Sequence, residues 1–107
     1  MDLVAKLKSN LPWFLRREKQ CEHVSLIQPV EPDMAGCEEC LQSGDTWVHL
    51  RVCLVCGHVG CCDNSKNKHA TKHFRATGHP VIQSGEAGED WIWCYEDKIT
   101  MPGTVAH

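Results

Sequence analysis

The sequence predicts a small α+β domain with a short twisted antiparallel sheet and one main helix, preceded by a helical extension at the amino terminus. Three observations predict it: short segments that alternate like strands, one stretch with helix start and stop signals, and a high content of cysteine and histidine. Of 107 residues, 8 are Cys and 7 are His. A chain of this length forms one domain with a modest core, so we expect a further stabilising element.

Residues 1–20 differ from the rest in charge and pattern. They carry a net charge of +3, whereas residues 21–107 carry −6. Apolar side chains recur in this segment at helical spacing: Leu3, Val4, Leu7, Leu11, Phe14 and Leu15. We therefore predict an amphipathic basic helix over residues 1–20. It would pack on the domain formed by residues 21–107 or offer a basic surface to a partner or to anionic lipid.

The elements of residues 21–107 are short. Residues 46–52 alternate in a way that predicts a half-buried strand leading into Cys53. A helix is predicted from an N-cap at Ser65 to a stop before Gly78 and Pro80. Residues 81–82 and 91–95 predict two further strands, with an exposed acidic loop at residues 86–90 between them.

Cysteine stabilises a short chain through disulfides or through metal binding. Disulfides need an oxidising compartment, which a secreted chain reaches through a signal peptide with an apolar core. Asp2, Lys6 and Lys8 interrupt any such core at the amino terminus. We therefore expect a cytoplasmic protein with reduced thiols. No segment approaches the roughly 18 apolar residues of a membrane helix, so we expect no membrane span.

Two Cys-x2-Cys pairs carry the strongest signal. Cys37 and Cys40 form the first pair, and Cys53 and Cys56 form the second, 12 residues further on. Each pair can hold one tetrahedral zinc ion across a tight turn, with zinc–sulfur distances of about 2.3 Å. A thioredoxin-like redox site would need a βαβ context that the pattern lacks. The two pairs therefore predict zinc.

Further residues of ligand type surround these pairs. His69 and His73 lie one turn apart on the predicted helix, so on spacing alone they could share one ion. Cys61 and Cys62 are adjacent, and either could be a ligand. His49 is expected at the surface, and His58 in the turn after the second pair or hydrogen-bonded to a ligand. Other candidates are Cys21, His23, His79 and Cys94.

The order and spacing of these residues resemble the UBP-type zinc finger, the ubiquitin-binding finger of many deubiquitinating enzymes and of a cytoplasmic histone deacetylase. The resemblance covers about residues 21–99. It rests on these segments: Cys21-x-His23, Cys37-x2-Cys40, Cys53-x2-Cys56-Gly57-x3-Cys61, His69-x3-His73, Thr77-Gly78-His79-Pro80 and Trp93-Cys94-Tyr95.

The resemblance to three-zinc members of the family implies three Zn²⁺ sites. The first would take Cys37, Cys40, Cys61 and His69. The second would take Cys53, Cys56, His73 and His79. The third would take Cys21, His23, Cys94 and Asp97, with the aspartate standing where the family has a second late cysteine. A carboxylate is an acceptable zinc ligand, but hard oxygen in place of soft sulfur should weaken this site or leave it empty.

The resemblance also implies a pocket for the free carboxy-terminal tail of ubiquitin or a similar protein. In such modules the tail's diglycine enters between aromatic rings, and an Arg meets its carboxylate, because a buried carboxylate must be paired. Trp93 and Tyr95 match pocket aromatics, and Trp47 or Trp91 could add another wall.

Three positions depart from the family pattern at this pocket. Asp63 stands where the family has its carboxylate-binding Arg, and Asn64 stands where it has the adjacent aromatic. Arg51 replaces an aromatic two residues before the second cysteine pair. Because Asp63 would repel a carboxylate, we expect ubiquitin binding to be weak or absent unless Arg51 or Lys66 supplies the missing charge.

We expect a monomeric, non-catalytic recognition module. Two of the sites have four protein ligands and no open position, and Ala70 stands where a metalloprotease helix carries its general-base Glu. The alternative is a structural or regulatory adaptor that docks a protein partner through residues 1–20. Nucleic-acid binding is disfavoured by the net charge of −3, despite four basic residues near the predicted helix: Lys66, Lys68, Lys72 and Arg75.

Overall fold

The computed structural model of the chain describes residues 21–103. The predicted amino-terminal helix over residues 1–20 lies outside the described residues. The elements in chain order are η2 Glu22–Leu26, α2 Glu38–Ser43, β1 Leu50–Cys53, β2 Val59–Cys61, α3 His69–Thr77, β3 Val81–Ser84, β4 Ile92–Cys94 and β5 Ile99–Met101. Among the helices of this part of the chain, none has the length and apolar character to cross a membrane.

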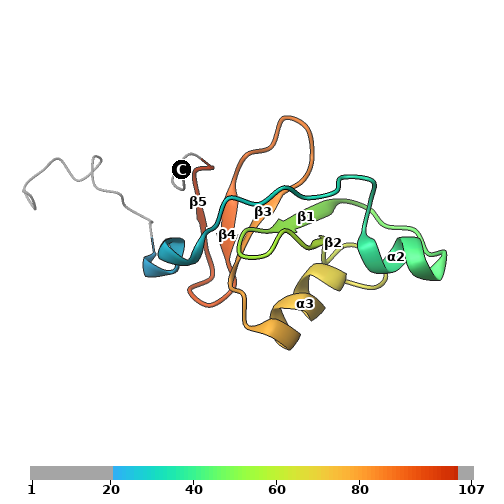
Figure 1. The fold of residues 1–107 in the computed structure, drawn as a ribbon, viewed down its shortest axis with the longest axis horizontal. Coiled ribbons are helices and arrows are strands. Elements are labelled where there is room, and N and C mark those ends of the chain that lie inside the picture. Colours follow the sequence, from blue (N-terminus) through green and yellow to red (C-terminus); the bar gives the residue numbers. More distant parts are fainter. Residues whose placement is uncertain (1–20, 104–107) are drawn as a thin grey trace, which may run out of the picture.

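The five strands form one antiparallel sheet in the order β2-β1-β3-β4-β5 (Figure 1). α3 is the main helix and packs chiefly against β2 and β1. The predicted α+β class, with its short antiparallel sheet, is therefore confirmed. The sequence did not predict β2, β5 or α2, because elements of three to six residues are too short for their periodicity to be recognised.

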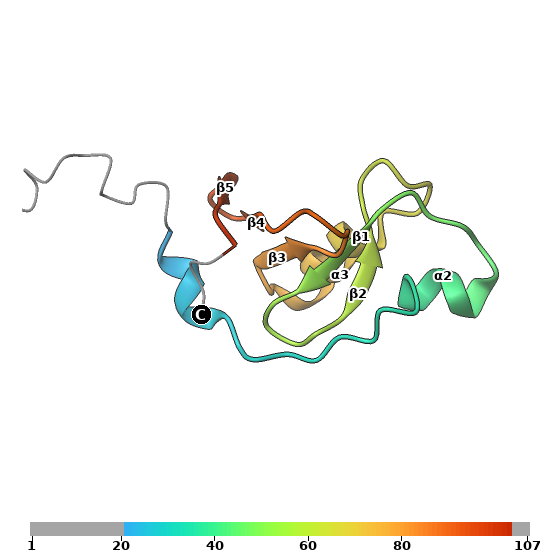
Figure 2. The same ribbon diagram turned by 90° about the horizontal axis from the view of Figure 1, so that it is seen from above.

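One face of the sheet, which we call the covered face, forms the hydrophobic core. Register places these buried side chains on it: Leu50, Val52, Val59, Cys61, Val81, Ile92, Cys94 and Met101. Val24, Ile27 and Val30 pack against this cluster. The segment that carries them runs beside the sheet from η2 to α2 (Figure 2). The backbone N–H of Gln28 ties it down by donating to the Leu54 carbonyl at 2.8 Å.

The other face, which we call the open face, carries Arg51, Gly60, Ile82, Trp93 and Thr100 in cross-strand register. α3 crosses this face at Gly60. A Cβ at that position would lie 2.7 Å from the backbone nitrogen of Ala70, so only glycine allows the helix to approach this closely. The part of the face around Trp93 is left available for a cavity.

The main helix begins later than the sequence predicted. α3 starts at His69, after Lys68 in a left-handed conformation with φ of 51°. Ser65, the predicted N-cap, is instead buried, and its hydroxyl accepts a hydrogen bond from the Val48 N–H at 2.9 Å. The prediction was wrong because this hydroxyl serves a loop that is distant in sequence. The predicted end is confirmed, since Gly78 caps the helix with φ of 79°.

The segment before β1 also differs from expectation, whereas the acidic loop does not. The strand predicted over residues 46–52 begins only at Leu50, because Val48 donates its backbone N–H to Ser65 instead of to a neighbouring strand. The acidic loop at residues 86–90 is exposed over residues 87–90, as predicted, but two of its carboxylates bond to the sheet. The Glu86 carboxylate accepts a hydrogen bond from the Leu50 N–H at 2.8 Å. The Glu89 carboxylate accepts one from the Ser84 hydroxyl at 2.6 Å.

Candidate metal centres and ligand cavity

Within residues 21–103, twelve side chains of ligand type converge in three groups of four. The Cys3His group consists of Cys37, Cys40, Cys61 and His69. The Cys2His2 group consists of Cys53, Cys56, His73 and His79. The Asp97 group consists of Cys21, His23, Cys94 and Asp97. Within each group the donor atoms lie within 4.8 Å of one another. We propose these twelve residues, the sets implied by the family resemblance, as the zinc ligands.

The Cys3His group has the spacing of a tetrahedral zinc site. Nδ1 of His69 lies 3.3 Å, 3.5 Å and 3.6 Å from the Sγ atoms of Cys37, Cys40 and Cys61. Zinc–donor distances of 2.0–2.3 Å imply tetrahedron edges of about 3.3–3.8 Å, so these donors fit the ion. α2 begins directly after Cys37 and carries Cys40, so one helical turn sets that pair.

The thiols of this group are enclosed by protein. Cys37, Cys40 and Cys61 are fully buried. Burial raises the pKa of the Cys37 thiol to about 12. A thiol with this pKa keeps its proton at neutral pH in the absence of metal, and zinc must displace that proton to bind the sulfur.

The Cys2His2 group is built from a turn, from the middle of α3 and from the segment just after this helix. Cys53 ends β1, and Gly57, with φ of 86°, closes the turn that brings Cys56 back toward it. Sγ of Cys56 lies 3.4 Å from Nε2 of His73. Sγ of Cys53 lies 3.6 Å from Nδ1 of His79. α3 thus supplies one histidine to each of two groups instead of placing His69 and His73 on one ion.

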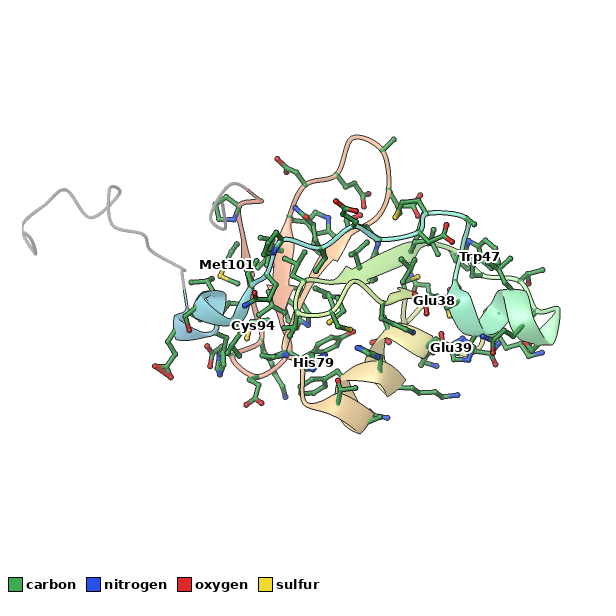
Figure 3. The ribbon with its side chains drawn as sticks, viewed as in Figure 1. Glu38, Glu39, Trp47, His79, Cys94 and Met101 are labelled. Atoms are coloured by element: carbon green, nitrogen blue, oxygen red, sulfur yellow. The ribbon has the colours of Figure 1, made fainter. Side chains whose placement is uncertain are left out.

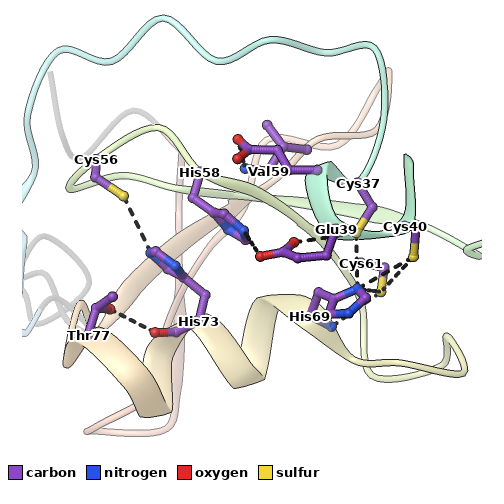
Figure 4. A network of polar contacts seen from close by, with 11 residues as sticks. Cys37, Glu39, Cys40, Cys56, His58, Val59, Cys61, His69, His73 and Thr77 are labelled. Atoms are coloured by element: carbon purple, nitrogen blue, oxygen red, sulfur yellow. Dashed lines mark hydrogen bonds and ion pairs between the residues drawn. The ribbon is translucent and has the colours of Figure 1, made fainter. Parts of the chain in front are cut away.

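His58 lies between these two groups (Figure 4). Its Nε2 is 2.7 Å from a carboxylate oxygen of Glu39, whose other oxygen is 3.8 Å from Sγ of Cys37. Burial raises the pKa of Glu39, but the hydrogen bond with His58, a backbone hydrogen bond and the charges of His58 and His69 together outweigh burial, so that the pKa is lowered. The His58 ring also stacks on His73, with centroids 4.1 Å apart and an interplanar angle of 4°. His58 therefore connects the two groups.

The Asp97 group joins segments that are far apart in sequence. Nδ1 of His23 lies 3.1 Å from Oδ2 of Asp97 and 3.4 Å from Sγ of Cys94. Figure 3 shows Cys94 beside Met101 at the β5 end of the sheet, far from Glu38 and Glu39. Cys94 is fully buried, but the Asp97 side chain is 40% exposed. Burial raises the pKa of Cys21 to about 11.

Three of the remaining candidates lie outside the groups. Cys62 is buried, with Sγ 3.6 Å from the Ser65 hydroxyl, and Cys61 occupies the metal group in its place. His49 is exposed. Trp47 packs over Gly36, where a Cβ would lie 2.5 Å from the indole ring. The sequence suggested Trp47 or Trp91 as a further wall of the ligand pocket; the Trp47 ring packs beside α2 (Figure 3) and does not line the cavity on the open face.

A cavity of about 390 Å³ opens on the open face beside α3. It is lined by the other predicted pocket residues and by Trp91, namely Arg51, Asp63, Asn64, Trp91, Trp93 and Tyr95. These residues come from β1, from the loop after β2, and from the region of β4. Strand pairing brings the segments that carry them together.

Arg51 is the cation of this cavity. Its guanidinium lies over the Trp91 ring at 4.7 Å, and Nη1 donates to the Leu50 carbonyl at 2.8 Å. Lys66, the other predicted source of positive charge, forms an ion pair with Asp45 at 3.2 Å and does not line the cavity. The geometry therefore favours Arg51 over Lys66 for contact with a bound anion.

Asp63 is the anion of the same cavity. Its Oδ1 accepts a hydrogen bond from the Thr71 hydroxyl at 2.6 Å. Thr71 Oγ1 also lies 3.2 Å from the Tyr95 hydroxyl, which is the donor there because Thr71 has given its one proton to the carboxylate. Tyr95 stacks on Phe74 of α3, with centroids 4.6 Å apart. Helix and sheet together hold Asp63 in position.

A family model described as a zinc finger in ubiquitin hydrolases and other proteins matches residues 37–103. The chain belongs to this family of UBP-type zinc fingers. The match includes Cys94 and Asp97 but begins after Cys21 and His23, so the third group extends beyond it. The family and the three donor groups together show a zinc-binding finger with about three sites.

Known relatives place this finger inside larger proteins. The chain is 33% identical over 99 residues to ubiquitin carboxyl-terminal hydrolase 45 of Mus musculus, covering 71% of this chain and 11% of that protein. It is 37% identical over 79 residues to the BRCA1-associated protein of Homo sapiens, covering 74% and 12%. The chain spans about a tenth of the length of these relatives, and the similarity is to their zinc finger and not to a hydrolase catalytic domain.

A solved structure has the same fold. The solution NMR structure of protein RPA1320 from Rhodopseudomonas palustris is 51% identical in sequence, with a TM-score of 0.76. The similarity covers 84% of this chain and 88% of that one. The finger therefore resembles a second chain of similar size as well as modules within large proteins.

Proposed function

We propose that this zinc finger is a non-catalytic recognition module whose open-face cavity binds the carboxy-terminal tail of a ubiquitin-like protein or peptide. The observation that carries the proposal is Arg51, a cation set among aromatic walls in a cavity of about 390 Å³. A carboxylate that leaves water must be paired, and a guanidinium is well shaped to pair with it.

Arg51 has donors to spare for such a ligand. A guanidinium has five N–H groups, and the bonds to Leu50 and Ser84 both use Nη1. No residue among those described, 21–103, forms an ion pair with Arg51. Its position over Trp91 also limits its motion, so that less conformational entropy is lost when a carboxylate binds.

Ubiquitin is the first ligand to test, because relatives of this finger are named ubiquitin carboxyl-terminal hydrolases. Asp63 lines the same cavity and repels a carboxylate. We therefore expect ubiquitin to bind weakly, through Arg51, or not at all. A ligand whose charge suits both side chains would bind better.

The zinc groups support the non-catalytic part of the proposal. Each group has four protein donors, which is the closed arrangement of structural zinc. All eight cysteines lie within the described residues, and none of them forms a disulfide. A cytoplasmic location and a monomeric state remain predictions.

Calorimetric titration with ubiquitin tests this function. We expect weak binding that disappears when the ubiquitin tail ends in an amide instead of a carboxylate. Arg51→Gln should abolish binding, whereas the matched control Lys66→Gln should leave it unchanged, since Lys66 is paired with Asp45 outside the cavity. Short peptides with a free carboxylate extend the test if ubiquitin itself does not bind. Equal binding of carboxylate and amide forms would contradict the proposal.

The adaptor alternative depends on residues 1–20, which lie outside the described residues. Deletion of residues 1–18 separates the two functions. A finger that binds through its cavity keeps its ligand after the deletion, whereas an adaptor that docks through the amino-terminal segment loses its partner.

A further inference from the structure

Two opposite charges line the cavity without neutralising each other. Arg51 and Asp63 both border it, yet no ion pair joins them in the described part of the chain. Asp63 is exposed and has no cationic partner among residues 21–103. Opposite charges in one small cavity usually pair directly unless they are held apart. Here each is held by its own neighbours.

The constraints on the two side chains come from different elements. Arg51 is fixed on β1 by the Leu50 carbonyl and by the face of Trp91. Asp63 is fixed by Thr71 of α3, which in turn is hydrogen-bonded to Tyr95. Only one carboxylate oxygen of Asp63 takes part in this chain of bonds. The other oxygen, with its lone pairs, remains for a ligand.

We propose that the cavity selects carboxy-terminal tails that carry a basic side chain in the penultimate residue, with Arg51 binding the carboxylate and Asp63 binding the cation. This inference rests on the proposed tail-binding function. It names the class of ligand: a peptide terminus with a negative and a positive group close together. An acidic side chain at the same place is repelled by Asp63 and is selected against.

The walls of the cavity suit such a ligand. Trp93 and Tyr95 offer apolar surface to the methylene groups of a Lys or Arg side chain, while its charged end reaches Asp63. Asn64, beside Asp63, adds amide donors and acceptors at the exposed rim. A tail without a basic side chain leaves the free oxygen of Asp63 facing the bound carboxylate, which weakens binding.

Short acetylated peptides that differ only in the penultimate residue test the inference. The set ends in Lys-Gly, norleucine-Gly or Glu-Gly with a free carboxylate, and the Lys-Gly peptide is also made as an amide. Fluorescence titration of the zinc-loaded full chain should show Lys-Gly binding about tenfold more tightly than norleucine-Gly, as one charge-assisted hydrogen bond provides. Glu-Gly should bind more weakly than norleucine-Gly.

Asp63→Asn is the matched variant, because it keeps the size of the side chain and its hydrogen bond to Thr71. We expect it to bind Lys-Gly and norleucine-Gly equally, while its zinc content and circular dichroism match those of the unmodified chain. Asp63→Glu should retain the preference for Lys-Gly and serves as a second variant if Asp63→Asn fails to fold.

The outcomes distinguish a failure of the Asp63 role from a failure of tail binding itself. If the carboxylate peptides bind but Lys-Gly has no advantage, or if its advantage survives in Asp63→Asn, the role of Asp63 is refuted and tail binding stands. If no carboxylate peptide binds, or if the amide binds as well as the acid, the proposed function itself is refuted.

Discussion

The three metal groups differ in how they are tied to the fold. The Cys3His and Cys2His2 groups share α3, which gives His69 to one and His73 to the other, and His58 connects them. The Asp97 group stands apart, joining Cys21 and His23 to the β4–β5 turn through an exposed carboxylate. The difference teaches that the first two groups organise the centre of the domain, whereas the third closes one end of it.

The largest expected effect comes from breaking the Cys3His group. Cys40→Ser replaces a fully buried thiolate donor with a poor ligand. Structural zinc in small fingers contributes about 10–16 kcal/mol of apparent folding free energy per site, so we expect the variant to lose zinc and unfold. Native mass spectrometry and circular dichroism measure both losses. Cys62→Ser is the control, since Cys62 is also buried but belongs to none of the metal groups in residues 21–103. A Cys40→Ser protein that still holds all its zinc would refute the ligand assignment.

The next largest effect is expected in the order in which a chelator removes the three zinc ions. A chelator added in small steps should remove the ion of the Asp97 group first, because one donor is a carboxylate and that donor is exposed. We expect a folded species with two ions to accumulate in native mass spectra before the fold is lost. Simultaneous loss of all ions would show that the third group is as firmly held as the others.

A smaller effect is expected at the connection between the first two groups. His58→Ala removes both the hydrogen bond to Glu39 and the stack on His73. Loss of a residue that orients metal ligands typically weakens metal binding by about tenfold to a hundredfold. Competition with a chromogenic chelator should show this loss for the two central ions and not for the third. His49→Ala, at an exposed position, is the control, and equal metal affinity in both variants would rule out the connecting role.

The smallest effect is a gain. Asp97→Cys restores a fourth soft donor to the third group, and we expect its ion to survive chelator concentrations that strip it from the unmodified chain. The two central ions should be lost at the same chelator concentrations as in the unmodified chain, so the variant changes the retention of the third ion alone. If the third ion is still lost first, exposure and not donor type is the cause of its weakness.

Local patterns were the part of the fold that could be predicted from sequence. The end of α3 was predicted correctly because Gly78 and Pro80 act on their immediate neighbours. Its start was not, because the hydroxyl of Ser65 bonds to Val48, 17 residues away. β2 and β5, with three residues each, have no readable period and form because register with β1 and β4 satisfies their backbone groups.

The candidate sites divide in the same way. Zinc followed from cysteine pairs whose two-residue spacing fits one ion across a single turn. The packing position of Trp47 could not be predicted from the sequence, because its contact with Gly36 depends on how the segment before α2 folds back. Nor did the link from Glu39 through His58 to His73, which joins three elements that are separate in sequence.

The sequence by itself indicated the metal and the donor types, because ligand chemistry and short spacings are local properties, and the family resemblance added the departures at Arg51, Asp63 and Asn64. Spacing alone left His69 and His73 free to share one ion; the family resemblance implied that they divide between two groups, and the tertiary structure brings the donors of each group together. Only the tertiary structure decided that Arg51 and Asp63 border one cavity without pairing. The physical reason is that strand register and helix packing set the distance between residues that are far apart along the chain, and charges act through that distance.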